Sequence, residues 1–233
     1  MAGTIIITGA NGSLAMPAVE HLLTHFPDFT LVLTVRNDSR DDVNTNALRG
    51  VVARFHDDGN ARASIRKLDL SSLNAVHKFT EAIADEIFQG FLPPLASIVC
   101  NAYYWNLSHP LQMTVDGYEK SMQVCHIAHV ALVLRLLGSF NLHGGRIVLF
   151  ASDAHEPGKN SREVIPPSIP TQHKRLELLA KPTPDDATVA DNTGYGFYRF
   201  ANAKLAVTTW GHALNHHLEK ASFKPHLFRR HTH

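Results

Sequence analysis

The sequence predicts an α/β fold in which helices cover both faces of a doubly wound parallel sheet. Short runs of apolar, β-branched residues alternate along the chain with segments whose apolar residues recur at helical spacing. Parallel strands need long crossovers, so this alternation favours a parallel sheet. In addition, Gly9, Arg36, Asp69 and Asn101 each follow a predicted strand. Ligands of such sheets bind at the carboxyl ends of the strands, so we expect these residues to share one site.

The composition describes one globular domain. The chain has 233 residues, a formal net charge of +1 and 44% hydrophobic residues, which argues against a nucleic-acid or membrane partner. We expect a single domain over residues 1–220 with an insertion at 158–192, followed by a disordered tail over 221–233. Two cysteines in apolar segments and the lack of a basic-then-apolar leader favour a cytoplasmic protein.

The first motif, T-I-I-I-T-G-A-N-G-S-L-A over residues 4–15, predicts a phosphate-binding corner. Ile5–Ile7 suit a buried strand, and Gly9 and Gly12 allow a tight turn before a helix that begins near Leu14. The free N–H groups of a helix start favour an anionic pyrophosphate. The motif departs from the strict dinucleotide fingerprint, so an ordinary strand-to-helix turn stays an alternative.

The end of the second strand bears on the choice of cofactor. Thr30–Val35 is followed by Arg36. An acidic residue about 20 residues beyond the glycines would bind the ribose hydroxyls of NAD, whereas a basic residue suits the extra phosphate of NADP. The sequence therefore favours NADP over NAD, with a solvated arginine as the alternative.

Later segments complete the predicted α/β pattern. We expect three more strands at Ala63–Leu68, Ala96–Cys100 and Arg146–Ala151. A long helix is expected from Val115 to Leu137, and a last helix is expected to run from Asn202 to Leu218.

Five motifs in order resemble the short-chain dehydrogenase/reductase family: T-G-A-N-G, D-L-S-S-L, N-A, I-V-L-F-A-S and A-N-A-K-L-A. More narrowly, the chain looks like the fungal oxidoreductases of that family that belong to secondary metabolism. The resemblance runs from Gly3 to about Leu218 and implies a Rossmann-like fold that binds a nicotinamide dinucleotide. The cofactor contacts that it implies are Thr8, Gly9, Asn11, Gly12, Leu14, Arg36, Asp69, Leu70, Asn101, Ala102 and Lys204.

The same resemblance assigns the catalytic positions. The family's carbonyl-polarising serine matches Ser152, and the lysine that holds the ribose matches Lys204. The tyrosine that transfers the proton falls on Phe200, and the asparagine of the proton relay falls on Cys125. A phenyl ring has no ionisable oxygen, so general acid catalysis, which contributes about 10²–10⁴-fold, is expected to be lost. Tyr103, Tyr195 and Tyr198 are nearby candidates to replace it.

The C-terminal part departs from the family as well. Relatives continue into another strand, a Pro-Gly turn and a helical segment over the substrate, and none of these is visible after Leu218. We therefore expect a sheet without its last one or two strands. The Pro-rich insertion is either a lid over the substrate pocket or a surface excursion.

Two histidine pairs have helical spacing, His126 with His129 and His212 with His216. Neither pair has the further carboxylate or histidine ligand of a known metal motif in its segment, so no metal is expected.

Two functions remain open at this point. The first is an NADP(H)-dependent oxidoreductase that acts on a carbonyl or secondary alcohol of a small metabolite. The second, motivated by Phe200 and Cys125, is a non-catalytic dinucleotide-binding relative. A homo-oligomer is also open, because the long and last helices commonly pair in relatives.

Overall fold

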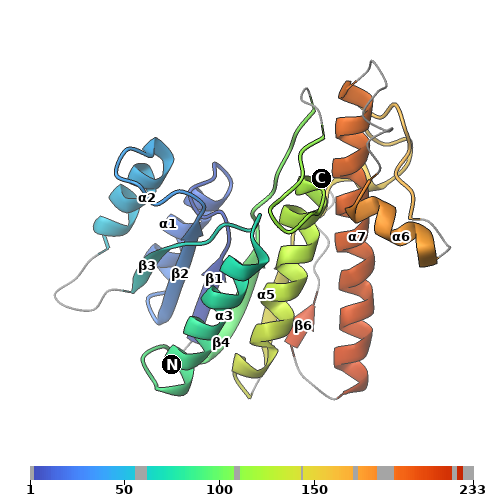
Figure 1. The fold of residues 1–233 in the computed structure, drawn as a ribbon. Helices are drawn as coiled ribbons and strands as arrows, with labels where there is room; N and C mark the ends of the chain where they lie inside the picture. Colours follow the sequence, from blue (N-terminus) through green and yellow to red (C-terminus); the bar gives the residue numbers. More distant parts are fainter. Residues whose placement is uncertain are drawn as a thin grey trace.

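The computed structural model describes residues 3–55, 62–107, 111–142, 144–169, 173–182, 192–221 and 225–227. Within these residues, six strands form one sheet in the order β3-β2-β1-β4-β5-β6, and every pair of neighbours is parallel (Figure 1). The predicted doubly wound parallel sheet is thereby confirmed. The strands are β1 Gly3–Ile7, β2 Phe29–Val35, β3 Ala63–Lys67, β4 Leu95–Cys100, β5 Gly145–Leu149 and β6 Pro225–Leu227.

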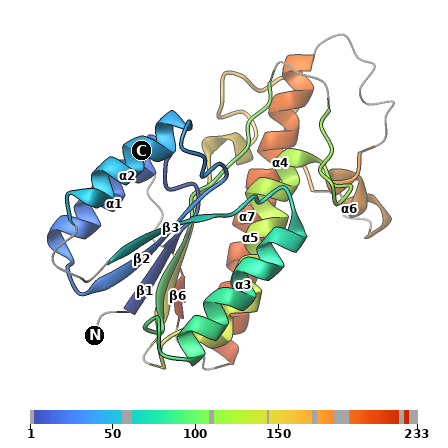
Figure 2. The same ribbon diagram turned by 60° about the vertical axis from the view of Figure 1, so that its left-hand side comes forward.

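Helices lie on both faces of the sheet. Helices α1 and α2 cover one face, and α3, α5 and α7 cover the other (Figure 2). The helices and helical turns are α1 Ala15–His25, α2 Val43–Ala53, α3 Leu73–Phe88, α4 Lys120–Met122, η1 Gln123–Ile127, α5 Ala128–Leu136, η2 Leu137–Ser139, η3 Asp153–His155, α6 His173–Ala180 and α7 Asn192–Lys220.

The alternation of side chains along the central strands builds two cores. In β1, Ile5 and Ile7 belong to the core under α1 and α2, whereas Ile6 belongs to the core under α3, α5 and α7. In β2, Leu31 and Leu33 likewise face the first core. A strand with both faces buried has to be apolar throughout, which is the physical reason for the triple isoleucine.

The strand order places a crevice at the centre of the sheet. The chain moves outward from β1 through β2 to β3, and then returns to pair β4 with the other side of β1. The segments that follow β1 and β4 therefore diverge at the carboxyl ends of the strands, where sheets of this kind bind ligands.

Two helices differ from the sequence prediction in where they begin. The long helix was expected from Val115, but it begins at Lys120 because residues 114–119 form a turn with a bridge between Met113 and Glu119. The last helix was expected from Asn202 and begins at Asn192. Within the insertion, residues His173–Ala180 form the short helix α6. Residues 170–172 and 183–191 of the insertion lie outside the described residues.

The C-terminal segment contains a strand that the sequence analysis missed. Residues Pro225–Leu227 pair in parallel with β5, with Gly145 opposite Pro225 and Ile147 opposite Leu227. The prediction of a disordered tail over 221–233 is therefore wrong at β6. Apart from Ala221, the rest of that segment lies outside the described residues.

The segment from Lys120 to Ser139 is long and apolar enough to cross a membrane by length and composition alone. In this fold, 56% of its apolar window is buried, and α5 packs against α3. The apolar composition is accounted for by that packing, because a core helix needs apolar residues on most of its surface.

Candidate functional site

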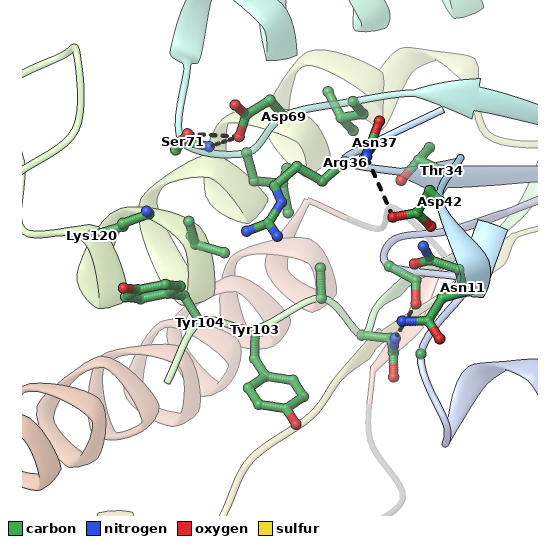
Figure 3. A pocket seen from close by; sticks show the side chains of 18 residues that line it. Asn11, Thr34, Arg36, Asn37, Asp42, Asp69, Ser71, Tyr103, Tyr104 and Lys120 are labelled. Carbon is green, nitrogen blue, oxygen red and sulfur yellow. Dashed lines mark hydrogen bonds between the residues drawn. The ribbon is translucent and has the colours of Figure 1, made fainter. Parts of the chain in front are cut away.

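A cleft of about 560 Å³ opens at the carboxyl ends of the strands, between the turn after β1 and the loop after β4 (Figure 3). Its walls also include the segments that follow β2 and β3. The structure brings most of the predicted cofactor residues to this one cleft: Gly9, Asn11, Gly12, Arg36, Asp69, Leu70, Asn101 and Ala102.

The floor of the cleft is a close contact between two strand ends. Gly9 has a positive φ of 64°, and a Cβ at this position would lie 3.0 Å from the Cα of Ala102. Asn101 Nδ2 donates to the carbonyl oxygens of Thr8 (2.9 Å) and Gly9 (3.1 Å). These contacts hold the ends of β1 and β4 together, and a side chain at Gly9 would be both strained and crowded.

Helix α1 starts directly after this turn. The carbonyl oxygen of Gly12 accepts hydrogen bonds from the N–H groups of Ala15 (3.1 Å) and Met16 (3.0 Å). No side chain caps the helix at its N-cap residue, Leu14, but the Gly12 carbonyl oxygen already takes the first two N–H groups, and the third residue, Pro17, has none. What this end of the helix offers to an anion is the partial positive charge of its dipole. The side chain of Leu14 is 63% exposed and lies outside the cleft lining. The predicted contact of Leu14 with the cofactor is therefore not one that its side chain makes.

The side chain of Arg36 extends into the cleft from the end of β2 (Figure 3). Within the described part of the chain, no hydrogen bond or ion pair engages its guanidinium. An arginine in this position can take a phosphate with two parallel hydrogen bonds.

A hydrogen-bonded group forms the wall on the α2 side of Arg36. Asn11 Nδ2 donates to Thr45 Oγ1 (2.9 Å), and Thr45 Oγ1 donates to the carbonyl oxygen of Asn37 (2.8 Å). Asp42 caps α2 by accepting the N–H of Thr45 (2.7 Å), and this hydrogen bond lowers the pKa of the Asp42 carboxyl. The glycine turn and α2 are thereby fixed relative to each other.

The opposite wall is the corner that follows β3. Asp69 Oδ1 accepts hydrogen bonds from the Ser71 N–H (2.9 Å) and hydroxyl (2.6 Å). Next to it, Gln123 Nε2 donates to the carbonyl oxygen of Leu70 (3.3 Å) and to Asp116 Oδ2 (2.7 Å). Gln123 is fully buried, so η1 holds this wall in place from behind.

Several cleft residues were missed by the sequence analysis, and Tyr104 and Lys120 are two of them. The hydroxyl of Tyr104 donates to Gln112 Oε1 (2.8 Å), and Lys120 Nζ donates to the same oxygen (3.2 Å). Lys120 Nζ also lies 4.6 Å from the centroid of the Tyr104 ring. The paired tyrosines after Asn101-Ala102 are a signal that could have been used, but only the fold brings Lys120 beside them.

Thr8 supports the cleft from behind and does not line it. Its side chain is fully buried. Thr8 Oγ1 accepts the N–H of Ala102 (3.0 Å) and lies 2.9 Å from His129 Nε2. The side chain of Thr8 therefore faces the core and not the cleft, and its role in cofactor binding stays a prediction.

The positions matched to the family's catalytic residues lie in a different region. Cys125 and Phe200 belong to one buried apolar cluster together with Ala154, which is in η3 directly after the Ser152 segment. Lys204 lies one turn beyond Phe200 on α7. None of Ser152, Cys125, Phe200 and Lys204 lines the cleft described above.

The hydroxyl of Ser152 is engaged in local hydrogen bonds. Ser152 Oγ donates to Asp153 Oδ1 (3.2 Å) and accepts the N–H of Ala154 (3.2 Å). These bonds cap η3. The hydroxyl must exchange Asp153 for a substrate oxygen before it can polarise a carbonyl.

Lys204 is a buried amine. Its Nζ donates to the carbonyl oxygen of Phe150 (2.8 Å) and lies 5.6 Å from the centroid of the Phe200 ring. Burial lowers the pKa of Lys204, because desolvation disfavours the ammonium form.

An aromatic stack fills the surroundings of Phe200. Phe200 is 4% exposed, and its ring centroid lies 4.6 Å from that of Trp105, which also contacts Phe197 edge-on at 6.3 Å. The stack depends on Gly196, because a Cβ there would collide with the carbonyl oxygen of Asn106. The loop after β4 can therefore rest directly on α7 and lay Trp105 against Phe200.

Cys125 lies in the π-helical turn η1. Its Sγ accepts the N–H of Tyr104 (3.4 Å) and donates to the carbonyl oxygen of Tyr104 (3.6 Å). Burial raises the pKa of the Cys125 thiol, so this residue is a neutral anchor for the loop after β4.

The three tyrosines named as candidate proton donors lie in different surroundings. Tyr103 is exposed, and Tyr195 and Tyr198 are half-buried on α7. Across the described part of the chain, none of their hydroxyls forms a hydrogen bond to Lys204 or Ser152.

The histidines of the sequence analysis have separate surroundings. His129 contacts Thr8 and the carbonyl oxygen of Cys125, while the ring of His126 packs edge-on against Trp210 at 6.2 Å. In the described ranges, no three His, Cys, Asp or Glu residues are grouped so that they could hold a metal ion.

Sequence comparisons with known proteins find oxidoreductases as relatives. No family model matches the chain. The WW domain-containing oxidoreductase of Danio rerio is 32% identical over 152 residues, which are 65% of this chain and 33% of that protein. Short-chain dehydrogenase iccH of Talaromyces variabilis is 31% identical over 161 residues, 66% of this chain and 42% of that protein. The chain thus spans less than half the length of these relatives.

Solved structures extend the likeness to nearly the whole chain. A short-chain dehydrogenase from Streptomyces avermitilis superposes with a TM-score of 0.61 at 16% identity, covering 98% of this chain and 64% of that one. This chain has the short-chain dehydrogenase fold. A blue fluorescent protein from a metagenomic library, solved in complex with NADPH, shares that fold with a TM-score of 0.64 at 19% identity, covering 97% of this chain and 72% of that one. The short-chain dehydrogenase fold therefore extends beyond the segment of detectable sequence similarity.

Proposed function

We propose that this chain is a member of the short-chain dehydrogenase/reductase family, and that it binds NADP(H) and acts as an oxidoreductase on a carbonyl or secondary alcohol of a small metabolite. The cleft at the strand switch point carries this proposal, because the turn from Gly9 to Gly12 and the side chain of Arg36 line it together. The resemblance of the sequence motifs to fungal oxidoreductases of secondary metabolism is the reason for proposing a secondary metabolite as substrate. We also propose that the protein is cytoplasmic and that it forms a homo-oligomer.

The residues of the cleft fit such a cofactor. Gly9 and Gly12 bring backbone to the surface of the cleft, and the positive end of the α1 dipole, which directly follows this turn, would favour a pyrophosphate there. Arg36 would take the 2′-phosphate that distinguishes NADP from NAD. Asp42, which lines the same end of the cleft, is a negative charge that works against the phosphate, so the preference for NADP depends on Arg36.

When bound, NADPH would supply a hydride equivalent to the reaction. Ser152 would polarise the carbonyl after releasing Asp153, and Lys204 would hold the nicotinamide ribose. Phe200 has no proton to give. We therefore expect turnover to be lower by about 10²–10⁴-fold than with a tyrosine at this position.

The aromatic stack favours a second candidate function. Trp105 rests on Phe200 at 4.6 Å, which gives the phenyl ring a packing role that a proton donor does not need. A protein with an intact cleft and this stack would bind dinucleotide without turnover, as a sensor or as support for a partner enzyme.

One experiment separates the two functions. NADPH and NADH are titrated into the wild type, Arg36→Ala and Arg40→Ala, followed by turnover of the wild type and Phe200→Tyr on a panel of carbonyl compounds. We expect tighter binding of NADPH than of NADH, loss of that preference in Arg36→Ala, and no change in Arg40→Ala, since Arg40 lies outside the cleft lining.

Turnover then decides between the candidates. Slow turnover by the wild type that rises in Phe200→Tyr supports the oxidoreductase. Binding without turnover in the wild type supports the non-catalytic function. Binding of neither dinucleotide would contradict both.

A further inference from the structure

His129 reaches the dinucleotide cleft from behind, through the core. It lies at the start of α5, is 3% exposed, and each ring nitrogen has one partner. Nδ1 lies 3.2 Å from the carbonyl oxygen of Cys125, and Nε2 lies 2.9 Å from Thr8 Oγ1. The second contact joins α5 to the last residue before the glycine turn.

These partners determine where the protons lie. A carbonyl oxygen only accepts, so Nδ1 carries the proton and donates to Cys125. Burial lowers the pKa of His129 to about 4, so the ring is neutral near pH 7 and Nε2 is an acceptor. The single proton of the Thr8 hydroxyl therefore goes to Nε2 in preference to the more distant carbonyl oxygen of Val99 at 3.3 Å.

The orientation of this hydroxyl matters to the cleft. With its proton directed at His129, Thr8 Oγ1 presents a lone pair to the N–H of Ala102, which it accepts at 3.0 Å. Ala102 is the residue that approaches Gly9 most closely. The chain from His129 through Thr8 to Ala102 thus determines the spacing between the two strand ends that form the cleft floor.

We propose that His129 is a positioning residue of the dinucleotide cleft, which acts by orienting the Thr8 hydroxyl toward the backbone of Ala102. The proposal rests on the proposed function, because it assigns the cleft to a dinucleotide. A purely structural histidine would contribute to stability alone, whereas a positioning histidine also controls affinity for the ligand.

Thr4 provides a matched control on the same strand. Thr4 and Thr8 are both fully buried in and beside β1, and the hydroxyl of Thr4 donates to the carbonyl oxygen of Pro93 (2.7 Å) at the opposite end of the strand. Thr4→Val and Thr8→Val therefore remove the same group at equal burial, one far from the cleft and one beneath it.

The test measures the NADPH dissociation constant by fluorescence titration for Thr8→Val, His129→Phe, their double variant, His129→Gln and Thr4→Val, with thermal unfolding of the same samples. We expect Thr8→Val and His129→Phe each to weaken binding about fivefold, as for one lost hydrogen bond. The double variant should be no weaker than either single variant, because both act through one contact. His129→Gln keeps an acceptor and should retain most of the affinity, and Thr4→Val should keep all of it.

A second measurement is independent of the cofactor. Hydrogen exchange of the Ala102 amide in the ligand-free protein should be faster in Thr8→Val and His129→Phe than in Thr4→Val. If His129→Phe fails to fold, Thr8→Val and His129→Gln carry the test.

The outcomes distinguish this proposal from the proposed function. Unchanged affinity and unchanged Ala102 exchange in Thr8→Val and His129→Phe, with lowered melting temperatures, would show that the histidine is structural only. A wild type that binds neither NADPH nor NADH would instead overturn the assignment of the cleft. Faster Ala102 exchange in that case would still show that His129 positions the cleft floor.

Discussion

The cleft beside β1 and the aromatic cluster under α7 both lie toward the carboxyl ends of the strands, but they are lined by different kinds of side chain. The cleft is lined by polar side chains and a glycine turn, and the guanidinium of Arg36 has no hydrogen bond or ion pair there within the described residues. In the cluster, Phe197 and Phe200 are almost completely buried, and the Trp105 ring contacts both of them. The cleft keeps groups available for a ligand, whereas the cluster satisfies its groups internally. The comparison teaches that a polar cleft and a closed apolar cluster form side by side in this fold from separate sets of residues.

The largest effect that we expect concerns the helix between the two regions. Burial lowers the pKa values of His126 and His129 to about 4, below the value of about 6.5 in an unfolded chain. Between these values the unfolded state binds more protons, so stability falls as the pH is lowered from about 6.5 toward 4.

From pH 7 to pH 5 this loss amounts to about 3 kcal/mol for the two groups. Urea unfolding at both pH values measures it. His126→Phe should remove about half of the pH dependence, while His25→Gln, at an exposed position on α1, is the control. If the free energy of unfolding depends on pH as strongly in His126→Phe as in the wild type, His126 does not titrate as its burial requires.

A change at Gly9 separates the two regions by function. Gly9→Ala should destabilise the protein by about 2 kcal/mol and weaken NADPH binding at least tenfold, because the new Cβ meets the backbone of Ala102 in a left-handed conformation. Gly90→Ala is the matched control, since φ there is +78° and a Cβ at that position would have no heavy atom within 4 Å. It should cost about 1 kcal/mol and leave binding intact. Equal effects of the two variants on affinity would argue against a close approach at Gly9.

The smallest effect is expected from the aromatic stack. Trp105→Leu removes the ring contact with Phe200 and should cost about 1 kcal/mol of stability. The affinity for NADPH should stay within twofold, because Trp105 is not part of the cleft lining. Chemical denaturation and fluorescence titration test both statements. A large loss of affinity would show that the cluster and the cleft are coupled.

The sequence was sufficient for the arrangement of strands and for much of the cleft. Apolar β-branched runs such as Ile5–Ile7 are buried on both faces, and that requirement is local enough to be read from the residues. The glycine turn, Arg36 and the Asp69 corner follow strands directly, so predicting the strands also placed these residues at one edge of the sheet.

Other features could not be predicted because they depend on contacts between distant segments. The start of the long helix at Lys120 depends on the bridge between Met113 and Glu119, and β6 forms only because it finds the free edge of β5. A three-residue strand has too little pattern of its own to be recognised.

The sequence by itself determined that Gly9, Arg36, Asp69 and Asn101 would meet at one cleft and that position 200 carries a phenyl ring without a hydroxyl, because strand ends and residue identities are properties of the chain. The tertiary structure decided what surrounds those residues. It placed Trp105 on Phe200, turned Lys204 toward Phe150, and put His129 behind Thr8. Burial and hydrogen-bond partners are set by packing between segments far apart in sequence, which no local pattern contains.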